Sequence, residues 1–168
     1  MNTEINSTLE LPYKLIDIGD STEQFTLCFK SFDEAQSAHS IQTSGVSGVF
    51  EVEYKCSGID CRFECDMTVG NLFYFYTELE NVYECLPGIE PVAFLNNYGA
   101  DMHTDMSLKF DKKGHFNVIG HFKNKQNNYK SSIAFDIQAD TAFVYDILGS
   151  LKAFFDELKR IQGHGNFY

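Results

Sequence analysis

Three potential metal ligands stand at alternate positions in the second half of the chain. They are Asp101, His103 and Asp105. Alternate side chains of an extended backbone point to the same side, so the three would converge. Imidazole and carboxylate groups bind zinc or a harder divalent ion. The triplet also opens a predicted strand after a glycine turn, where Asp and His are common solvated residues. A metal site and a plain strand start therefore both stay open.

Other histidines and cysteines have spacings that ordinary strands explain. Cys61 and Cys65 are four positions apart, which on a strand places both small thiols on one buried face. His115 and His121 share a face of another predicted strand, as side chains on a wet outer surface do. A bridge between Cys56 and Cys61 across a hairpin is geometrically conceivable, but a reducing compartment would keep both thiols free.

Motifs of enzymatic catalysis are missing from the sequence. No Ser or Cys stands in a nucleophile motif with a His partner. There is no glycine-rich phosphate loop. Aromatic residues follow apolar stripes rather than basic residues, so no platform for stacking bases is predicted. The residues themselves thus show no catalytic constellation, and we predict neither a catalytic residue nor a cofactor.

Composition and charge restrict the class of partner. The chain has 168 residues, 43% of them hydrophobic, which predicts one folded domain. Its formal net charge of −11 would repel nucleic-acid backbones and attract a basic protein. Solubility alone is the alternative reason for such a charge. No apolar run approaches a membrane span, and neither a signal-peptide pattern nor an even cysteine count appears, so we expect a cytoplasmic protein with free thiols.

The clearest structural signal is a strand followed by a long helix between Lys130 and Ile161. Ile133, Phe135 and Ile137 alternate with smaller or polar residues, which is typical of a strand. The apolar residues that follow at helical spacing are Val144, Ile147, Leu148, Leu151, Phe155, Leu158 and Ile161. Asp140 is the predicted N-cap. Gly149 lies within this helix, either to allow close approach to a strand, which we expect, or as a tolerated defect.

Similar signals precede this unit. Strands are predicted at 15–18, 24–30, 49–56, 61–66, 105–110 and 116–122, with a further short one at 92–95 and a turn at 96–99. A helix over 68–86 is expected to begin at Asp66 or Thr68. Both halves of the chain thus read as hairpin strands, a polar cap and a long amphipathic helix, although their residue identity is too low to establish a repeat.

An acidic strand face is the candidate partner-binding surface. A four-residue turn at 57–60 would place Glu53 opposite Glu64 and Glu51 opposite Asp66, a mildly destabilising arrangement. The face is either simply solvated or an acidic surface for a cationic partner. In the second case, neutralising Glu51 and Glu53 should stabilise the free protein but weaken binding of that partner. The candidate contacts are Glu51, Glu53, Glu64 and Asp66, with Asp33 and Glu34 from the long loop.

These signals predict a single α+β domain over residues 1–168. We expect an antiparallel sheet of about six or seven strands with two long amphipathic helices packed on it. The core should lie within 24–161, residues 1–12 should be flexible, and 31–47 should form a Ser-rich loop.

The order of these segments resembles the WapI-like bacterial immunity proteins. The resemblance covers roughly residues 24–161 and is carried by VFEVEYKC, CRFECDMTVGNLFYFYTELENV, GIEP, SLKFDKKGHFNVIGHF and IAFDIQADTAFVYDILGSLKAFFDEL. The chain departs from the family in lacking a Trp ahead of the first family strand and in carrying the Ser-rich segment at 31–47.

The resemblance implies a function in polymorphic or contact-dependent toxin systems. Such a protein binds and neutralises the C-terminal domain of its cognate toxin, a basic and nuclease-type partner, without catalysis. It would be a monomer or weak dimer that binds neither nucleic acid nor membrane. Two alternatives stay open, namely a metal-dependent hydrolase that uses Asp101, His103 and Asp105, and a non-inhibitory accessory or scaffold protein.

Overall fold

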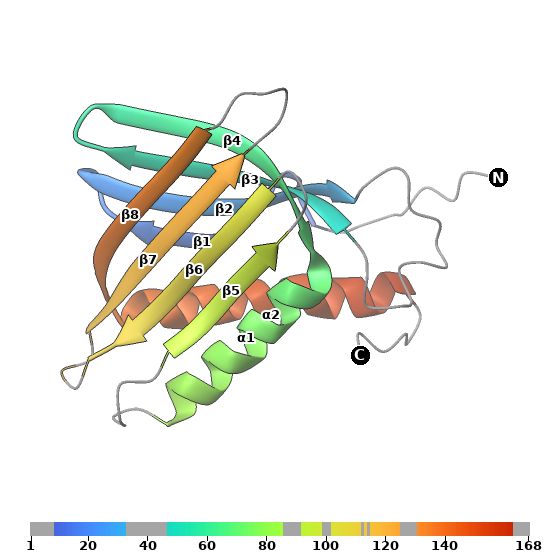
Figure 1. The fold of residues 1–168 in the computed structure, drawn as a ribbon. Helices are drawn as coiled ribbons and strands as arrows, with labels where there is room; N and C mark the ends of the chain where they lie inside the picture. Colours follow the sequence, from blue (N-terminus) through green and yellow to red (C-terminus); the bar gives the residue numbers. More distant parts are fainter. Residues whose placement is uncertain are drawn as a thin grey trace.

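The described part of the chain forms eight strands and two helices in two successive halves of the same order (Figure 1). The computed structural model describes residues 9–32, 47–85, 92–98, 102–111, 113, 115–124 and 131–162. The first half contains β1 (Tyr13–Gly19), β2 (Glu23–Phe32), β3 (Ser47–Cys56), β4 (Ile59–Thr68) and α1 (Val69–Glu84). The second half contains β5 (Val92–Tyr98), β6 (Met102–Phe110), β7 (His115–Asn124), β8 (Ser131–Asp140) and α2 (Ala142–Gln162).

The strands form two antiparallel sheets rather than one. Sheet A has the order β1-β2-β3-β4 and sheet B the order β5-β6-β7-β8. The α+β class and the two long helices are confirmed, but the prediction of a single sheet of six or seven strands is wrong. Each described strand pairs only with strands next to it along the chain, even where the connection is as long as residues 33–46 between β2 and β3. The helix α1 then separates the fourth strand from the fifth and closes the first group.

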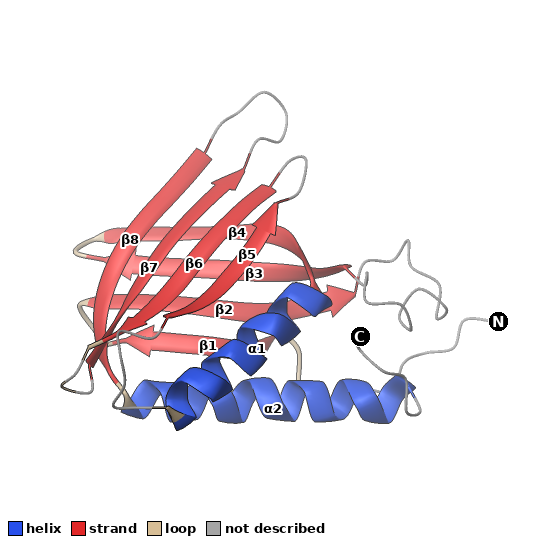
Figure 2. Cartoon of the chain, turned by 60° about the horizontal axis from the view of Figure 1, so that its bottom comes forward, coloured by secondary structure: helices blue, strands red, loops and turns tan. Residues whose placement is uncertain are grey.

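The core lies between the two sheets, which cross one another (Figure 2). Alternating apolar residues give each sheet one apolar face, and the two faces pack together. The ring of Phe25 in sheet A lies 4.7 Å from Phe135 and 5.8 Å from Phe122, both in sheet B. Tyr54 of sheet A stacks on Phe135 at 5.1 Å. These aromatic contacts join the two halves of the chain into one core.

Each helix lies along the first strand of the half to which it does not belong (Figure 2). The helix α2 follows β1, where the Tyr13 hydroxyl donates to the Ser150 carbonyl at 3.1 Å. Phe154 of α2 also packs its ring 5.0 Å from Phe29. The helix α1 follows β5, where the Phe94 amide donates to Glu78 Oε2 at 3.0 Å. The first strands of both sheets are therefore covered at their outer edges.

The N-cap of α1 and the buried stripe of α2 follow the sequence prediction, and Asp140 binds the start of α2 from one position before the cap. Thr68 is the N-cap of α1, and its hydroxyl accepts from the Asn71 amide at 3.2 Å. Asp140 accepts from the amide of Ala142, the first residue of α2, at 2.9 Å. The buried residues of α2 include Val144, Ile147, Leu151, Phe155 and Leu158. Among the described residues, neither helix is long and apolar enough to cross a membrane.

Segments between the predicted strands differ from expectation in places. The strand predicted at 92–95 exists but continues through 96–98, where a turn was predicted. Pairing of every residue of β5 with β6, including Asn96 with Asp105, outweighs the turn preference of the two asparagines. The ends of the predicted loop at 31–47 belong to strands β2 and β3, and residues 33–46 lie outside the described part of the chain, as do 1–8.

Gly149 does not provide close approach to a strand. It is exposed, and a Cβ at this position would meet no atom within 4 Å. The alternative interpretation, a tolerated defect, fits the structure. Replacing Gly149 with alanine should therefore stabilise the protein by about 1 kcal/mol, because alanine loses less conformational freedom in a helix. Urea unfolding would measure this, and a lower midpoint for the variant would contradict it.

Candidate partner-binding surface

The hairpin between β3 and β4 has a two-residue turn rather than the predicted four-residue turn. Ser57 and Gly58 have φ values of 45° and 88°. Positive φ at both central positions is characteristic of the type I′ turn, whose twist matches that of the strands. The register consequently shifts by two residues, so that Glu53 faces Arg62 and Glu51 faces Glu64. The predicted pairing of Glu53 with Glu64 and of Glu51 with Asp66 is wrong.

The corrected register builds an ion network on the outer face of sheet A. The charged residues of this face whose side chains the structure describes are Lys14, Lys30, Lys55 and Arg62 among the cations and Asp17, Glu51, Glu53, Asp60 and Glu64 among the carboxylates. Arg62 contacts Glu53, and it lies 4.0 Å from Glu51. Lys30 contacts Glu64, and it lies 3.6 Å from Glu51. The side chains of Glu51 and Glu53 are only 14% and 19% exposed, so both are already paired and partly covered.

The predicted contact residues are only partly brought together. Glu51, Glu53 and Glu64 share the outer face of sheet A. Asp66 lies on β4 opposite Val49, but its side chain is outside the described part of the structure. Residues 33 and 34, the two further candidates, also lie outside it. Among the described side chains of this face, four cations alternate with five carboxylates, so the described part of the face is mixed in charge.

The ion network predicts how charge changes affect stability. Replacing Arg62 with glutamate places like charges beside Glu53 and Glu51, so the protein should lose about 1 kcal/mol, the upper range for exposed ion pairs. Exchanging the charges in Arg62→Glu/Glu53→Arg should recover part of that loss. A double-mutant cycle in urea measures the coupling. Additive effects of the Arg62 and Glu53 changes would contradict the network. Neutralising Glu51 and Glu53 removes partners of Arg62 and Lys30, so we now expect this change to destabilise the free protein instead of stabilising it.

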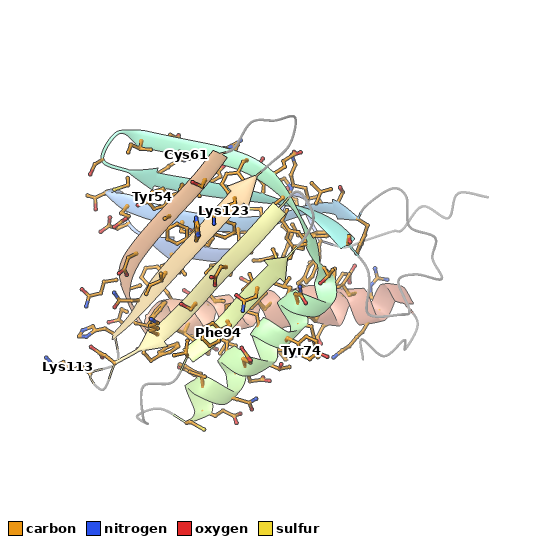
Figure 3. The ribbon with its side chains drawn as sticks, in the orientation of Figure 1. Tyr54, Cys61, Tyr74, Phe94, Lys113 and Lys123 are labelled. Carbon is orange, nitrogen blue, oxygen red and sulfur yellow. The ribbon has the colours of Figure 1, made fainter. Side chains whose placement is uncertain are left out.

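A second surface combines carboxylates with exposed aromatic rings. We call it the α1–β5 surface and define it by Tyr74, Glu78 and Phe94 on the β5 side of α1, with Glu84 and with Glu80, which lies on the flank of α1 near Lys152 of α2. Tyr74 is 68% exposed and Phe94 is 47% exposed. The helix α1 carries three glutamates and no lysine or arginine. Figure 3 shows Tyr74 on α1 and Phe94 on the neighbouring strand β5.

Hydrogen bonds fix two of these carboxylates in place. Glu78 accepts the Phe94 amide, which ties the helix to the edge of β5. Glu80 accepts from the Tyr76 hydroxyl at 3.1 Å. Burial of the ring and the bond to the Glu80 carboxylate raise the pKa of Tyr76 to about 12, so the phenol stays protonated and keeps donating at neutral pH. The surface is therefore partly pre-organised before any partner arrives.

The potential metal ligands are not assembled into a site among the described residues. Asp101 and the side chain of His103 lie outside that part of the structure, and Asp105 is an exposed residue of β6 that faces His121 on β7. No group of three metal-binding side chains occurs in the part that is described. His115 and His121 lie on the outer face of sheet B, as predicted.

All five cysteines of the chain are free. Cys61 faces Tyr54 and Cys56 faces Ile59, so the two cysteines are diagonal rather than opposite. Diagonal residues of a hairpin lie roughly 7–8 Å apart, beyond the usual reach of a disulfide. Burial raises the pKa of the Cys28 thiol, so this group stays protonated at neutral pH.

Comparison with known proteins leaves the family open. No protein-family model matches the chain, and no curated protein matches it. Among solved structures, the plant transcriptional regulator PBF-2 is similar, with 9% identity, a TM-score of 0.48, and coverage of 90% of this chain and 84% of that chain. The trypanosome proteins MRP1/MRP2 are similar at 9% identity and a TM-score of 0.46, with coverage of 95% and 90%. At these values the likeness supports no inference about function.

Sequence reasoning missed the α1–β5 surface. The signal for its charge was visible, because Glu78, Glu80 and Glu84 fall in a segment without any cation. The exposure of Tyr74 and Phe94 was not visible, since each is flanked by apolar residues that are buried or partly buried. Which strand lies beside α1 depends on the packing of the whole molecule, and no local pattern in the sequence specifies it.

Proposed function

We propose that this protein neutralises a basic protein by binding it, in the manner of a bacterial immunity protein, and that the α1–β5 surface makes the main contact. The observation that carries the proposal is the combination of exposed Tyr74 and Phe94 with three carboxylates and no cation on α1. Aromatic anchors surrounded by a charged rim are typical of protein interfaces. Carboxylates of one sign accelerate encounter with a cationic partner.

The resemblance to the WapI-like immunity proteins indicates the kind of partner. It would be the C-terminal domain of a cognate toxin, basic and nuclease-type, bound without catalysis in the cytoplasm. A stable complex needs roughly 800 Å² from each partner. The exposed side of α1, which has 16 residues and is about 24 Å long, together with β5 offers a surface of suitable length.

Co-expression tests this proposal most directly. The protein should restore growth of cells that express the toxin domain encoded beside its own gene, and the purified pair should bind at low salt. Tyr74→Ala should weaken binding at least tenfold, because it removes a central aromatic anchor. Tyr145→Ala is the matched control, since Tyr145 lies on α2 and is 69% exposed. Absence of rescue and of binding with every adjacent toxin domain would refute the proposal, and equal effects of the two variants would refute the assigned surface.

A further inference from the structure

Of the four edge strands in the two sheets, two are covered by a helix and two are not covered by either described helix. The outer edges of β1 and β5 lie against α2 and α1, through the Tyr13–Ser150 and Glu78–Phe94 hydrogen bonds. The other two edges belong to β4 and β8, and neither described helix runs along them (Figure 1). A cavity of about 350 Å³ lies between these two strands. Open edges pair readily with other strands, so natural proteins cover those they do not use.

The edge of β4 presents unpaired main-chain groups. Cys56 and Ile59 flank the two-residue turn and therefore exchange hydrogen bonds with each other. In an antiparallel pair the hydrogen-bonded positions alternate, so Asp60, Arg62 and Glu64 direct their amides and carbonyls away from β3. Among the described residues, no group outside sheet A is hydrogen-bonded to these amides. These three alternate residues offer enough free amides and carbonyls at the sheet edge to pair with an added strand.

The cavity beside this edge has an apolar floor. It is lined by Asp60, Cys61, Arg62, Phe63, Phe122, Ser132 and Ile133. The rings of Phe63 and Phe122 pack edge to face with centroids 5.9 Å apart, and Ile133 of β8 lines the same cavity. Its volume is at the low end of ligand pockets, which suits a few apolar side chains rather than a large cofactor. An added strand would direct alternate side chains toward this floor.

The outer side chains of β4 have alternating charge. Asp60, Arg62 and Glu64 present negative, positive and negative groups at successive outward positions. Asp60 belongs to no ion pair within the described residues, and Glu64, although it contacts Lys30, has a side chain that is 59% exposed. Opposite charges directly across neighbouring strands attract, whereas like charges repel. The complementary strand therefore carries basic, acidic and basic residues at alternate positions.

We propose that the edge of β4 binds an extended segment of a partner protein as a fifth, antiparallel strand of sheet A. The segment reads basic, apolar, acidic, apolar, basic, with its apolar side chains in the cavity and its main chain paired with Asp60, Arg62 and Glu64. This is recognition by strand addition. The site is separate from the α1–β5 surface, as the positions of Cys61, Tyr74 and Phe94 in Figure 3 show, and it does not depend on the proposed function.

Peptides test the proposal with the whole protein. The probe is the fluorescent peptide Thr-Lys-Val-Glu-Val-Lys-Thr with blocked ends, and its binding is followed by fluorescence anisotropy. N-methylation of its Glu removes the amide that faces β4 and should weaken binding at least tenfold. N-methylation of either Val removes an amide that faces away and should change binding little. The charge-inverted peptide with Glu and Lys exchanged should bind at least tenfold more weakly.

Protein variants complete the test. Asp60→Lys/Glu64→Lys should bind the charge-inverted peptide better than the original one, while Tyr74→Ala should bind both peptides as the unchanged protein does. Circular dichroism confirms that each variant is folded. The proposal is overturned if the original peptide does not bind, if methylation of Glu and of Val has the same effect, or if Tyr74→Ala abolishes peptide binding. None of these results bears on rescue from a toxin, so the two proposals fail independently.

Discussion

Replacing Gly120 with alanine is expected to destabilise the protein by about 2–3 kcal/mol, in the upper part of the range for inserting a methyl group into a packed core. A Cβ at Gly120 would lie 2.2 Å from Cζ of Phe135 and 2.6 Å from Cε1. The ring cannot move away easily, because it also packs against Phe25, Tyr54 and Phe122 between the two sheets. The measurement is the free energy of unfolding in urea.

The control for this prediction is a second substitution that gives the ring more room. Phe135→Leu in the Gly120→Ala background should cost less than the sum of the two single changes, because the smaller side chain leaves space for the added methyl group. Gly149→Ala, the same chemical change at an open position, should act in the opposite direction. A Gly120→Ala protein as stable as the original would show that Phe135 has another position in the core.

Reversing charge on α1 is expected to slow association with a basic partner by ten- to a hundredfold. Glu80→Lys/Glu84→Lys converts two exposed carboxylates of the α1–β5 surface into cations, and association steered by charge depends strongly on such residues. Glu78 is left unchanged, because its carboxylate holds the Phe94 amide of β5. The Glu80 change removes the acceptor of the Tyr76 hydroxyl, so circular dichroism must show that the variant keeps its fold. Stopped-flow association rates at low and high salt measure the effect, which should shrink as salt increases.

A variant with equal net charge separates local from overall electrostatics. Asp136→Lys/Asp146→Lys changes the net charge of −11 by the same amount, but it acts on sheet B and α2 instead of α1. We expect its association rate to fall much less than that of the α1 variant. Equal losses would mean that only total charge matters, and the α1–β5 surface would then have no special role in binding.

Local patterns in the sequence predicted the elements well and their assembly poorly. The stripe from Val144 to Leu158 and the hydrogen bond of Asp140 to the start of α2 depend on neighbours along the helix, so they can be recognised without the fold. The division into two sheets depends on α1 ending the first group of strands, which no strand pattern records. The register of β3 and β4 depends on Ser57 adopting a φ of 45°, which a non-glycine residue does rarely, so the sequence pattern favoured the four-residue turn at 57–60.

The candidate site shows the same contrast between local and distant information. The sequence shows the charges of Glu51 and Glu53. Their partners Arg62 and Lys30 come from adjacent strands, and the register of those strands determines which charges meet. The β4 edge likewise could not be recognised, because a strand becomes an edge only when no other strand follows it. Its apolar cavity includes Ile133, which lies about seventy positions further along the chain.

The exchange of helices between the two halves has a consequence for cooperativity. Since α1 lies along β5 and α2 lies along β1, each set of four strands is completed only by the other half. A polypeptide that ended after α1 would leave the β1 edge bare, and one that began at β5 would lack the cover for its own first strand. The intact chain should therefore unfold in one thermal transition. Two fragments obtained by cleavage within 86–91 should each be unfolded alone and should regain structure when mixed, because each supplies the helix that covers the first strand of the other.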